Sequence, residues 1–328
     1  MNNAYLSNEE AQAINELMPG AQLFEIGSKL KTALANGVAL GTKWYLDPVN
    51  GQDTNDGLSP QTAFRTLPVA YAALTANKNE ILFVIGGASS LVLSSAFTWA
   101  KNFTHLVGLS ANLRFGGRVR IGHAGTALAT MFTVSASGCM FHNIHFQHGQ
   151  ASATNLICVS VSGQRNMFSN CHFEASLDTV ASGGSYAWRA VVIASGAQAN
   201  GFKGCTFGSW TTVWASAAGL LLLFAGDNAD TFVEDCVFIM NTSSTSMKAV
   251  GFTGPISGGY SYIMFGSCKF IATNAKPGVL FEKPTNGWIM MDKCNAFNVT
   301  AWAATNANLI EANGAANASG TGLGVAQA

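Results

Sequence analysis

Short apolar segments recur along the middle of the chain, and small or polar residues separate them. Between residues 131 and 297, apolar positions alternate with polar ones or run continuously for four to seven residues, with Gly, Asn, Ser and Asp between the runs. Segments of this length and pattern are typical of β-strands, and no helical spacing interrupts them. The sequence therefore predicts a region built from many short strands.

One pattern recurs six times in this region: an apolar residue, two further residues, Cys or Ile, one residue, and Phe. The copies are Phe141–Phe146, Phe168–Phe173, Phe202–Phe207, Val233–Phe238, Phe265–Phe270 and, in degraded form, Met291–Phe297. The Ile or Cys position falls at residues 144, 171, 205, 236, 268 and 294, so the intervals are 27, 34, 31, 32 and 26 residues. This irregular spacing indicates similar strands joined by loops of different lengths.

A second strand pattern, usually ending in Gly, lies between successive copies, as in Leu156–Gly163 and Ala190–Gly196. Two or three short strands in each unit of about 30 residues predict a right-handed parallel β-helix, whose turns stack about 4.8 Å apart. An antiparallel sandwich is the rival all-β fold, but it does not require the same residue type at the same place in every unit. We therefore expect an all-β right-handed parallel β-helix.

Five of the seven cysteines occupy one position of the repeat: Cys171, Cys205, Cys236, Cys268 and Cys294. A disulfide framework or a metal site is the alternative interpretation, but no pair has the close C-x-x-C spacing of a zinc knuckle. Stacking on successive turns also suits disulfide torsions poorly. We expect these thiols to form an interior column beside a parallel stack of the repeated Phe side chains.

A distinctive segment precedes the repeats. It runs from a strand at Trp44–Leu46 through N-G-Q-D-T-N-D-G-L-S-P-Q-T-A-F-R-T-L at residues 50–67 into a short helix that ends near Ala76. The motif from Tyr45 to Leu67, about 25 residues, together with the helix after it resembles the N-terminal cap of pectate-lyase-like parallel β-helix proteins, a superfamily that includes many phage tailspikes and other virion proteins. The repeats extend the resemblance to about residue 300. The resemblance implies a capped solenoid and either a virion role or activity on polysaccharides.

The two ends of the chain depart from the repeat. Ser7 and Glu10 form a capping box, and two apolar stripes, at residues 11–18 and 23–34, predict two short amphipathic helices without a core of their own. Residues 301–328 are rich in Ala, Asn and Gly and predict an extended tail. We expect a helical arm at 1–43, the cap and first turns at 44–122, the repeats at 123–300 and the tail at 301–328.

Charge is scarce: 10% of the residues are charged, against about 25% in ordinary soluble domains. Lys and Arg (17) balance Asp and Glu (17), so no basic surface for nucleic acid or anionic lipid is expected. The longest apolar run, residues 217–226, is about half of a membrane span, and the start lacks a secretory leader pattern. We expect synthesis in a reducing host cytoplasm and an outer surface covered by sister subunits or by a particle.

Because the resemblance includes activity on polysaccharides, the carboxylates are the candidates for catalysis. Glycoside hydrolases generally need two carboxyl groups about 5–9.5 Å apart. Asp227 and Asp230, in the turn after the Leu-rich strand, and Glu234 are the catalytic candidates. The repeats show no Asp cluster of the kind that binds calcium in lyases of this superfamily. Four aromatic residues in or near loops are candidate sugar platforms or packing residues: Tyr186, Trp188, Trp210 and Trp214.

Two groups are candidates for metal ligands. His145 and His172 occupy the same outward position of adjacent turns, where they are expected to stack, and the alternative is that they are solvent or interface residues. Asp53 and Asp56 supply oxygen atoms, but the alternative of Asx-turns in a Gly-rich corner fits better than an EF-hand spacing. No cofactor is expected.

The sequence favours a non-enzymatic virion structural protein of a tailed phage, a homotrimer that decorates the capsid or forms a head or tail fibre. Its partners would be itself and other virion proteins such as capsid or tail, bound through the N-terminal arm, and the phage assignment rests on the resemblance alone. The alternative is a tailspike-like protein that binds or cleaves a host surface polysaccharide.

Overall fold

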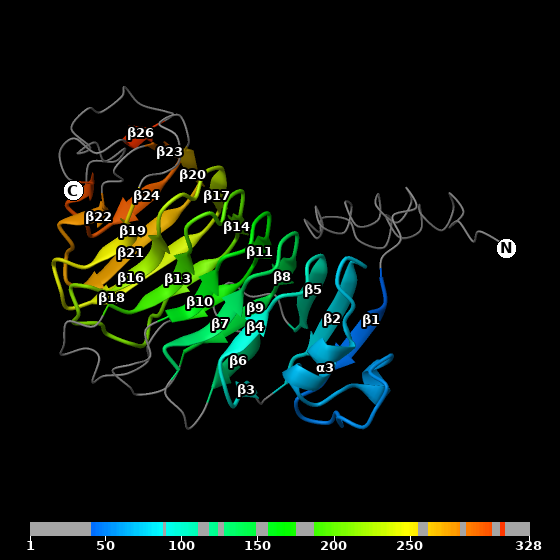
Figure 1. The fold of residues 1–328 in the computed structure, drawn as a ribbon. Coiled ribbons are helices and arrows are strands. Elements are labelled where there is room, and N and C mark those ends of the chain that lie inside the picture. The colour runs from blue at the N-terminus through cyan, green and yellow to red at the C-terminus, as the bar shows by residue number, and fades with distance from the viewer. Residues whose placement is uncertain are drawn as a thin grey trace, which may run out of the picture. The chain divides into compact units, whose positions relative to one another are not determined.

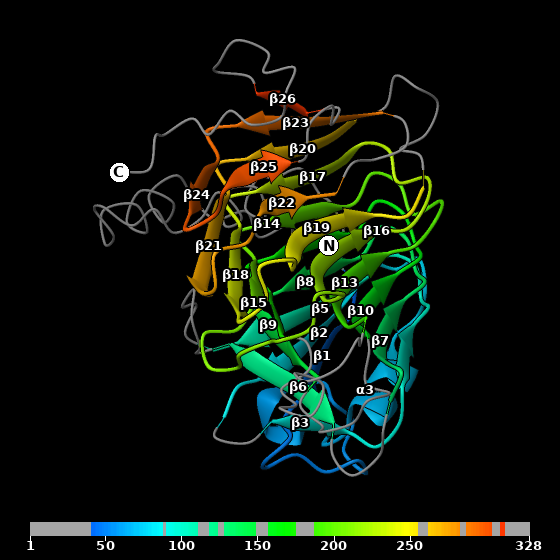
Figure 2. The ribbon, with the colours of Figure 1, turned by 90° about the vertical axis from the view of Figure 1, so that its left-hand side faces the viewer.

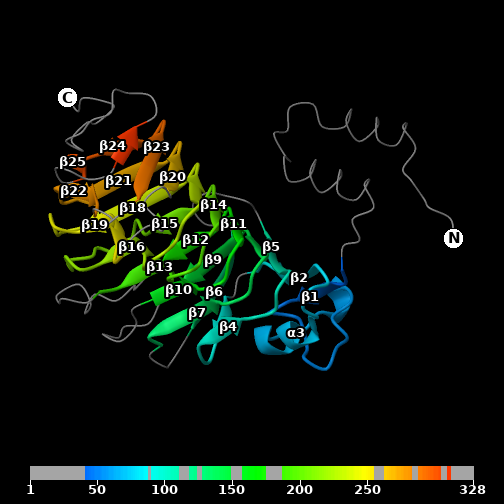
Figure 3. The same cartoon turned by 45° about the horizontal axis from the view of Figure 1, so that its top comes forward.

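In the computed structural model the chain winds through three parallel β-sheets, one strand of each sheet per turn (Figure 1). The structure describes residues 41–87, 90–110, 118–123, 128–148, 157–174, 187–254, 262–282, 287–303 and the backbone of 309–311. Every strand pair in the three sheets is parallel, and each strand pairs with the equivalent strand of the preceding and following turns. Figures 2 and 3 show the strands of successive turns stacked along one axis. The predicted parallel β-helix is confirmed.

We name the sheets A, B and C in the order in which the chain visits them. In the described part, sheet A consists of β1 (Lys43–Leu46), β2 (Glu80–Ile85), β5 (Thr104–Leu109), β8 (Met140–His142), β11 (Met167–Ser169), β14 (Gly201–Lys203), β17 (Thr231–Glu234), β20 (Tyr262–Gly266), β23 (Trp288–Asp292) and β26 (Leu309–Glu311). Sheet B consists of β3 (Leu91–Leu93), β6 (Val119–His123), β9 (Ile144–Gln147), β12 (His172–Glu174), β15 (Thr206–Gly208), β18 (Val237–Thr242), β21 (Lys269–Asn274) and β24 (Asn295–Phe297). Sheet C consists of β4 (Phe97–Trp99), β7 (Thr130–Val134), β10 (Ile157–Val161), β13 (Arg189–Ile193), β16 (Leu220–Phe224), β19 (Lys248–Phe252), β22 (Val279–Phe281) and β25 (Ala301–Ala303).

Repeated phenylalanines form the core in two columns, one from sheet A and one from sheet B. Phe168 and Phe202 pair in register in sheet A, with ring centroids 4.9 Å apart and planes inclined by 6°. Phe207 and Phe238 do the same in sheet B, at 4.6 Å and 5°. Because a register shift of one residue would turn every such ring outward, these columns fix the alignment of successive turns.

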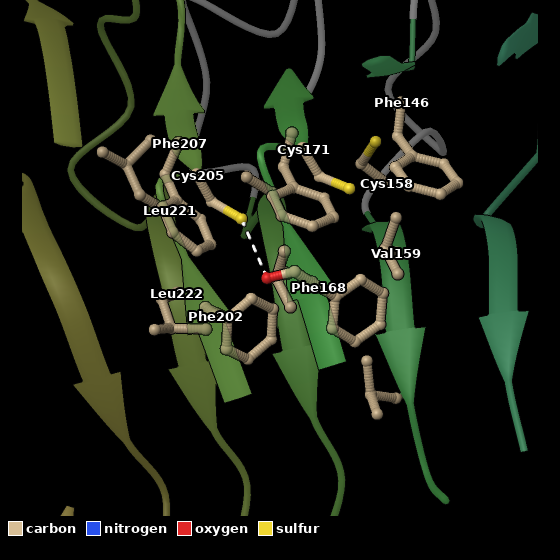
Figure 4. Packing of buried hydrophobic residues seen from close by; sticks show 14 of the residues in the cluster. Phe146, Cys158, Val159, Phe168, Cys171, Phe202, Cys205, Phe207, Leu221 and Leu222 are labelled. Atoms are coloured by element: carbon tan, nitrogen blue, oxygen red, sulfur yellow. Dashed lines mark hydrogen bonds between the residues drawn. The ribbon is translucent and has the colours of Figure 1, made fainter. Parts of the chain in front are cut away.

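The cysteine column lies beside the two phenylalanine columns, whose rings contact each other, as Phe202 and Phe207 do with ring centroids 5.7 Å apart (Figure 4). All seven cysteines are free and buried. Each thiol of the column donates to a backbone carbonyl of the preceding turn, as Cys205 does to Phe168 at 3.4 Å. The thiols are therefore packing residues with satisfied S–H groups, as the sequence predicts.

A single residue turns the chain from sheet A into sheet B. This residue has a positive φ angle in six successive turns: Asn143, Asn170, Gly204, Asp235, Ser267 and Lys293. Asn is among the few residues that adopt this left-handed conformation readily. Asn170 also donates from its side-chain Nδ2 to the side-chain Oδ1 of Asn143 at 3.1 Å, which links two successive corners.

The N-terminal cap has the predicted strand, Gly-rich corner and helix. Strand β1 pairs with β2. Between these two strands the chain forms a 3-10 helix, η1 (Pro60–Thr62), and an α-helix, α3 (Leu67–Ala73). The helix buries Leu67 and Ala70 against the core. Gly57 has a φ angle of 68°, and a side chain there would collide with the Phe64 ring.

The C-terminal boundary differs from the prediction. Strands β25 and β26 continue sheets C and A beyond residue 300, because Trp302 and its neighbours supply buried side chains for a further turn. The predicted helices at 11–18 and 23–34 and the tail after residue 311 lie outside the described residues. Among the helices of the described ranges, none is long and apolar enough to cross a membrane.

Candidate functional site

The acidic candidates flank strand β17 of sheet A. Asp230 is exposed and directly precedes the strand, whereas Glu234 is its last residue. Four residue steps of about 3.3 Å place their backbones about 13 Å apart. Asp227 lies in the corner before them, where its backbone carbonyl accepts from Gly196 at 2.6 Å. The strand therefore puts Asp230 and Glu234 at opposite margins of one outward surface.

An aromatic row begins at Asp230 and follows the axis of the solenoid. The Asp230 backbone N–H donates to the Tyr262 carbonyl at 3.1 Å, and Tyr262 pairs with Trp288 of the next strand. The exposed fractions of Tyr262 and Trp288 are 42% and 41%. Two large aromatic side chains thus point outward from adjacent strands, which lie about 4.8 Å apart.

An apolar row lies beside the aromatic row. Phe232, Met264 and Met290 are consecutive partners on β17, β20 and β23, and each side chain is half-buried. Gly201 precedes them in the row, and a Cβ atom there would collide with the Phe232 ring. The absence of a side chain at Gly201 therefore leaves room for the Phe232 ring.

A charged row forms the other margin. Glu234 pairs in register with Gly266, and Gly266 pairs with Asp292. Lys203 lies 3.7 Å from a Glu234 carboxylate oxygen, and Lys293 lies 4.0 Å from an Asp292 carboxylate oxygen. We call the surface formed by these three rows the A face. Its residues are Lys203, Asp230, Phe232, Glu234, Tyr262, Met264, Trp288, Met290, Asp292 and Lys293.

A second polar cluster lies on the outward side of sheet B, around Glu174. One carboxylate oxygen of Glu174 accepts from His145 Nε2 and from Gln147 Nε2, each at 3.0 Å. Burial raises the pKa of Glu174, but the hydrogen bonds from His145 and from the Ser209 side chain outweigh it and hold this pKa at about 2. The carboxylate is therefore ionised, and it fixes the proton of His145 on Nε2.

His172 stacks on His145, as the sequence predicts. The ring centroids are 4.2 Å apart, and His172 Nε2 donates to the Gly208 carbonyl at 2.7 Å. Both histidines are buried, with exposed fractions of 5% for His145 and 9% for His172, so the alternative of solvent-exposed histidines is wrong. Among the described residues, no group of three or more His, Cys, Asp or Glu side chains is arranged to hold a metal ion.

The next residues in the outward row of sheet B that contains His172 are uncharged. Thr206 and Val237 follow His172 in register and are buried, with exposed fractions of 0% and 2%. These values apply to a single chain. The chain itself therefore covers this row, and sister subunits are not needed to explain its lack of charge.

The acidic residues of the cap serve as hydrogen-bond acceptors for the backbone. Asp53 accepts from the backbone N–H groups of Arg65 and Thr66 at 2.9 and 2.8 Å and from the Thr66 hydroxyl at 2.9 Å. Asp56 accepts from the Leu58 N–H at 3.0 Å. The Asp56 bond is the Asx-turn that the sequence offers as the alternative to calcium binding, whereas Asp53 joins the Gly-rich corner to the backbone 12 and 13 residues further along the chain.

The four aromatic residues that the sequence offers as sugar platforms or packing residues lie elsewhere. Trp188 and Trp214 are buried and stack on each other with ring centroids 4.5 Å apart, so they pack the core. Trp210, with 45% of its side chain exposed, lies on the loop after β15, and Tyr186 lies outside the described residues. The residues missed are Tyr262 and Trp288, whose one sequence signal is an aromatic residue at the start of two apolar strands.

A scan against protein-family models and a search of the curated proteins both find no match to this chain. Solved structures do match. A pectate lyase, Pel9A, is 12% identical, with a TM-score of 0.58 over 84% of this chain and 74% of that one. The pectin methylesterase PemA from Erwinia chrysanthemi is 13% identical, with a TM-score of 0.54 over 85% of this chain and 92% of that one. A rhamnogalacturonan lyase is 13% identical, with a TM-score of 0.50 over 80% and 74% of the two chains.

These similarities show a shared parallel β-helix fold. At such low identity they do not transfer an activity, because one fold supports many functions. The three structures named here are enzymes of polysaccharides, not virion proteins. The expected virion role, the trimer and the N-terminal attachment stay predictions.

Proposed function

We propose that this chain is a polysaccharide-binding β-helix protein that holds its glycan along the A face. The observation that carries the proposal is the pair formed by Tyr262 and Trp288, which are exposed and in register on adjacent strands. Aromatic rings offer flat apolar surfaces on which the C–H faces of sugar rings stack, while their polar edges remain hydrated. Carboxylates at both margins supply acceptors for sugar hydroxyl groups.

The carboxylates of this surface are spread over both of its margins. The backbones of Asp230 and Glu234 lie about 13 Å apart along β17. Asp292 lies two strands from Glu234 in the same row, and Lys293 contacts it. The A face therefore presents acceptors for sugar hydroxyl groups at both margins.

The proposal is tested by affinity electrophoresis of the full-length chain in gels that contain plant and bacterial polysaccharides. We expect retardation by at least one glycan and a loss of affinity of about tenfold or more in Tyr262→Ala and in Trp288→Ala. Trp210→Ala is the matched control, because it removes an equally exposed aromatic side chain outside the A face.

Assays for reducing ends and unsaturated uronates on the same glycans test for cleavage. If a glycan retards Tyr262→Ala, Trp288→Ala and Trp210→Ala to the same extent, the placement of the glycan on the A face is contradicted. Cleavage that disappears in Asp227→Asn, Asp230→Asn or Glu234→Gln would show instead that the chain is a depolymerase.

A further inference from the structure

The chemistry of the A face selects among glycans. We infer that it binds a neutral polysaccharide whose sugars carry methyl or acetyl groups, such as 6-deoxy or O-acetylated sugars, in preference to polymers of uronic acids. This inference rests on the proposed function and adds the class of ligand.

The A face carries more carboxylates than ammonium groups. The A face holds three carboxylates, those of Asp230, Glu234 and Asp292, and two ammonium groups, so its net charge is 2 − 3 = −1. Lys203 and Lys293 each lie against one of the carboxylates, at 3.7 and 4.0 Å. A uronate chain brought onto this surface would meet carboxylates at both margins, and like charges in contact oppose binding.

The apolar row favours sugars that carry methyl or acetyl groups. A sugar that stacks on Tyr262 and Trp288 and reaches toward Glu234 must cross Met264 and Met290, which lie between these rows. A hydroxyl group pressed against a thioether or a phenyl ring loses hydrogen bonds to water without replacement. A methyl or acetyl group at the same position gains from leaving water, and the flexible Met side chains adjust to its shape.

The direction of the three rows suits a glycan chain that lies along the solenoid. Each row follows the axis of the solenoid, so the aromatic, apolar and charged rows run side by side over β17, β20 and β23. A glycan lying along the axis would present its ring faces to the first row, its substituents to the second and its hydroxyl groups to the third. The same arrangement therefore repeats for consecutive sugars.

The test compares acetylated xylan, the same xylan after chemical deacetylation, rhamnan and polygalacturonate, each with the full-length chain by affinity electrophoresis. We expect acetylated xylan to bind about tenfold more tightly than its deacetylated form, rhamnan to bind, and polygalacturonate to bind least. Met264→Gln and Met290→Gln replace the thioethers by amides of similar size and should reduce the preference for acetylated xylan. Met140→Gln, which changes a half-buried Met of the same row on β8, is the control.

Two outcomes separate the inference from the proposed function. If polygalacturonate or deacetylated xylan binds as tightly as acetylated xylan, and Trp288→Ala still abolishes binding, the ligand class is wrong and the glycan-binding face stands. If none of the four polysaccharides nor any other glycan retards the chain, the proposed function itself fails. Loss of the preference in Met140→Gln as well as in Met264→Gln would also overturn the role of the apolar row.

Discussion

The imidazole rings of His145 and His172 lie face to face on neighbouring strands, with centroids 4.2 Å apart and planes inclined by 12°. Burial, together with the adjacent His145 ring, lowers the pKa of His172 to about 3, and burial also lowers the pKa of His145. Two protonated rings at this distance would repel each other in a site with little water. The stack is therefore stable as a pair of neutral rings.

Acidification from about pH 7.5 to pH 5 is expected to destabilise the protein. Unfolded histidines take up a proton near pH 6.5, whereas folded His172 does so only near pH 3. The unfolded state consequently binds more protons in this window, and the free energy of unfolding falls by up to about 1.4 kcal/mol per pH unit for each such histidine. Urea unfolding at several pH values measures this slope. Ionised Glu174, whose pKa is about 2, also contributes to the free energy of unfolding, and this contribution is lost only as the pH falls below about 4.5.

His172→Gln separates the contribution of the stack from the rest of the chain. The Gln amide still donates toward the Gly208 carbonyl but does not titrate. The slope of stability against pH should therefore become shallower than that of the wild type between pH 6.5 and 5. If both proteins showed the same slope, His172 would not be held neutral by the fold.

The repeated positions explain why the fold follows from the sequence. Every turn of a parallel β-helix offers the same interior environment, so Phe168 and Cys171 recur one turn later as Phe202 and Cys205. The repeat therefore reveals both the parallel sheets and the interior columns.

The A face has no comparable sequence signal. Tyr262 and Trp288 are neighbours only because the register of β20 and β23 aligns them across a loop whose length varies between turns. The burial of His145 likewise depends on other parts of the chain that cover sheet B, which the local pattern does not record. Register and cover are properties of the three-dimensional arrangement, so the sequence predicted the stacking of His145 on His172 but not its burial.

Replacement of Gly204 by Asn is expected to stabilise the protein by up to about 0.5 kcal/mol. Gly204 turns sheet A into sheet B with a φ angle of 64°, and the heavy atom nearest to an added Cβ is Asn170 N at 4.0 Å. Asn143 and Asn170 adopt the same conformation at this corner, and Asn restricts the unfolded chain more than Gly does. Urea unfolding at pH 7.5 measures the change.

Gly208→Asn is the control for this substitution. Gly208 also has a positive φ angle, 99°, but a Cβ atom there would collide with the Ile239 carbonyl oxygen. The free energy of unfolding should fall in this variant while it rises in Gly204→Asn. Destabilisation of similar size in both variants would mean that the corner does not accept Asn at Gly204.

The buried thiols are expected to resist alkylation in the folded protein. All seven cysteines are buried, so the reagent does not reach their sulfur atoms, and burial also raises the pKa of Cys158, which disfavours the reactive thiolate. Mass spectrometry after iodoacetamide treatment should find no labelled cysteine in the native chain and seven in the urea-unfolded chain. Rapid labelling of Cys205 before unfolding would show that the core opens readily.

Asp53 is expected to stabilise the cap without calcium. Partial burial raises its pKa, but hydrogen bonds from Thr66 and Arg65 outweigh this and keep the pKa below the ordinary value. Asp53→Ala removes acceptors for two backbone N–H groups and one hydroxyl, so the free energy of unfolding should fall by about 1–2 kcal/mol. Asp56→Ala, which removes an acceptor for one exposed N–H, should have a smaller effect.

Melting temperatures measured with calcium and with a chelator distinguish the structural role of Asp53 from a cation site. Asp53 Oδ1 accepts two hydrogen bonds and Oδ2 accepts one, so the carboxylate is largely occupied by Thr66 and Arg65, and a bidentate cation would compete with these bonds. The melting temperature of the wild type should therefore be the same with millimolar calcium and with excess chelator. A calcium-dependent increase in melting temperature that is absent in Asp53→Ala would show that the carboxylate is a ligand, because only a bound cation shifts the folding equilibrium in this way.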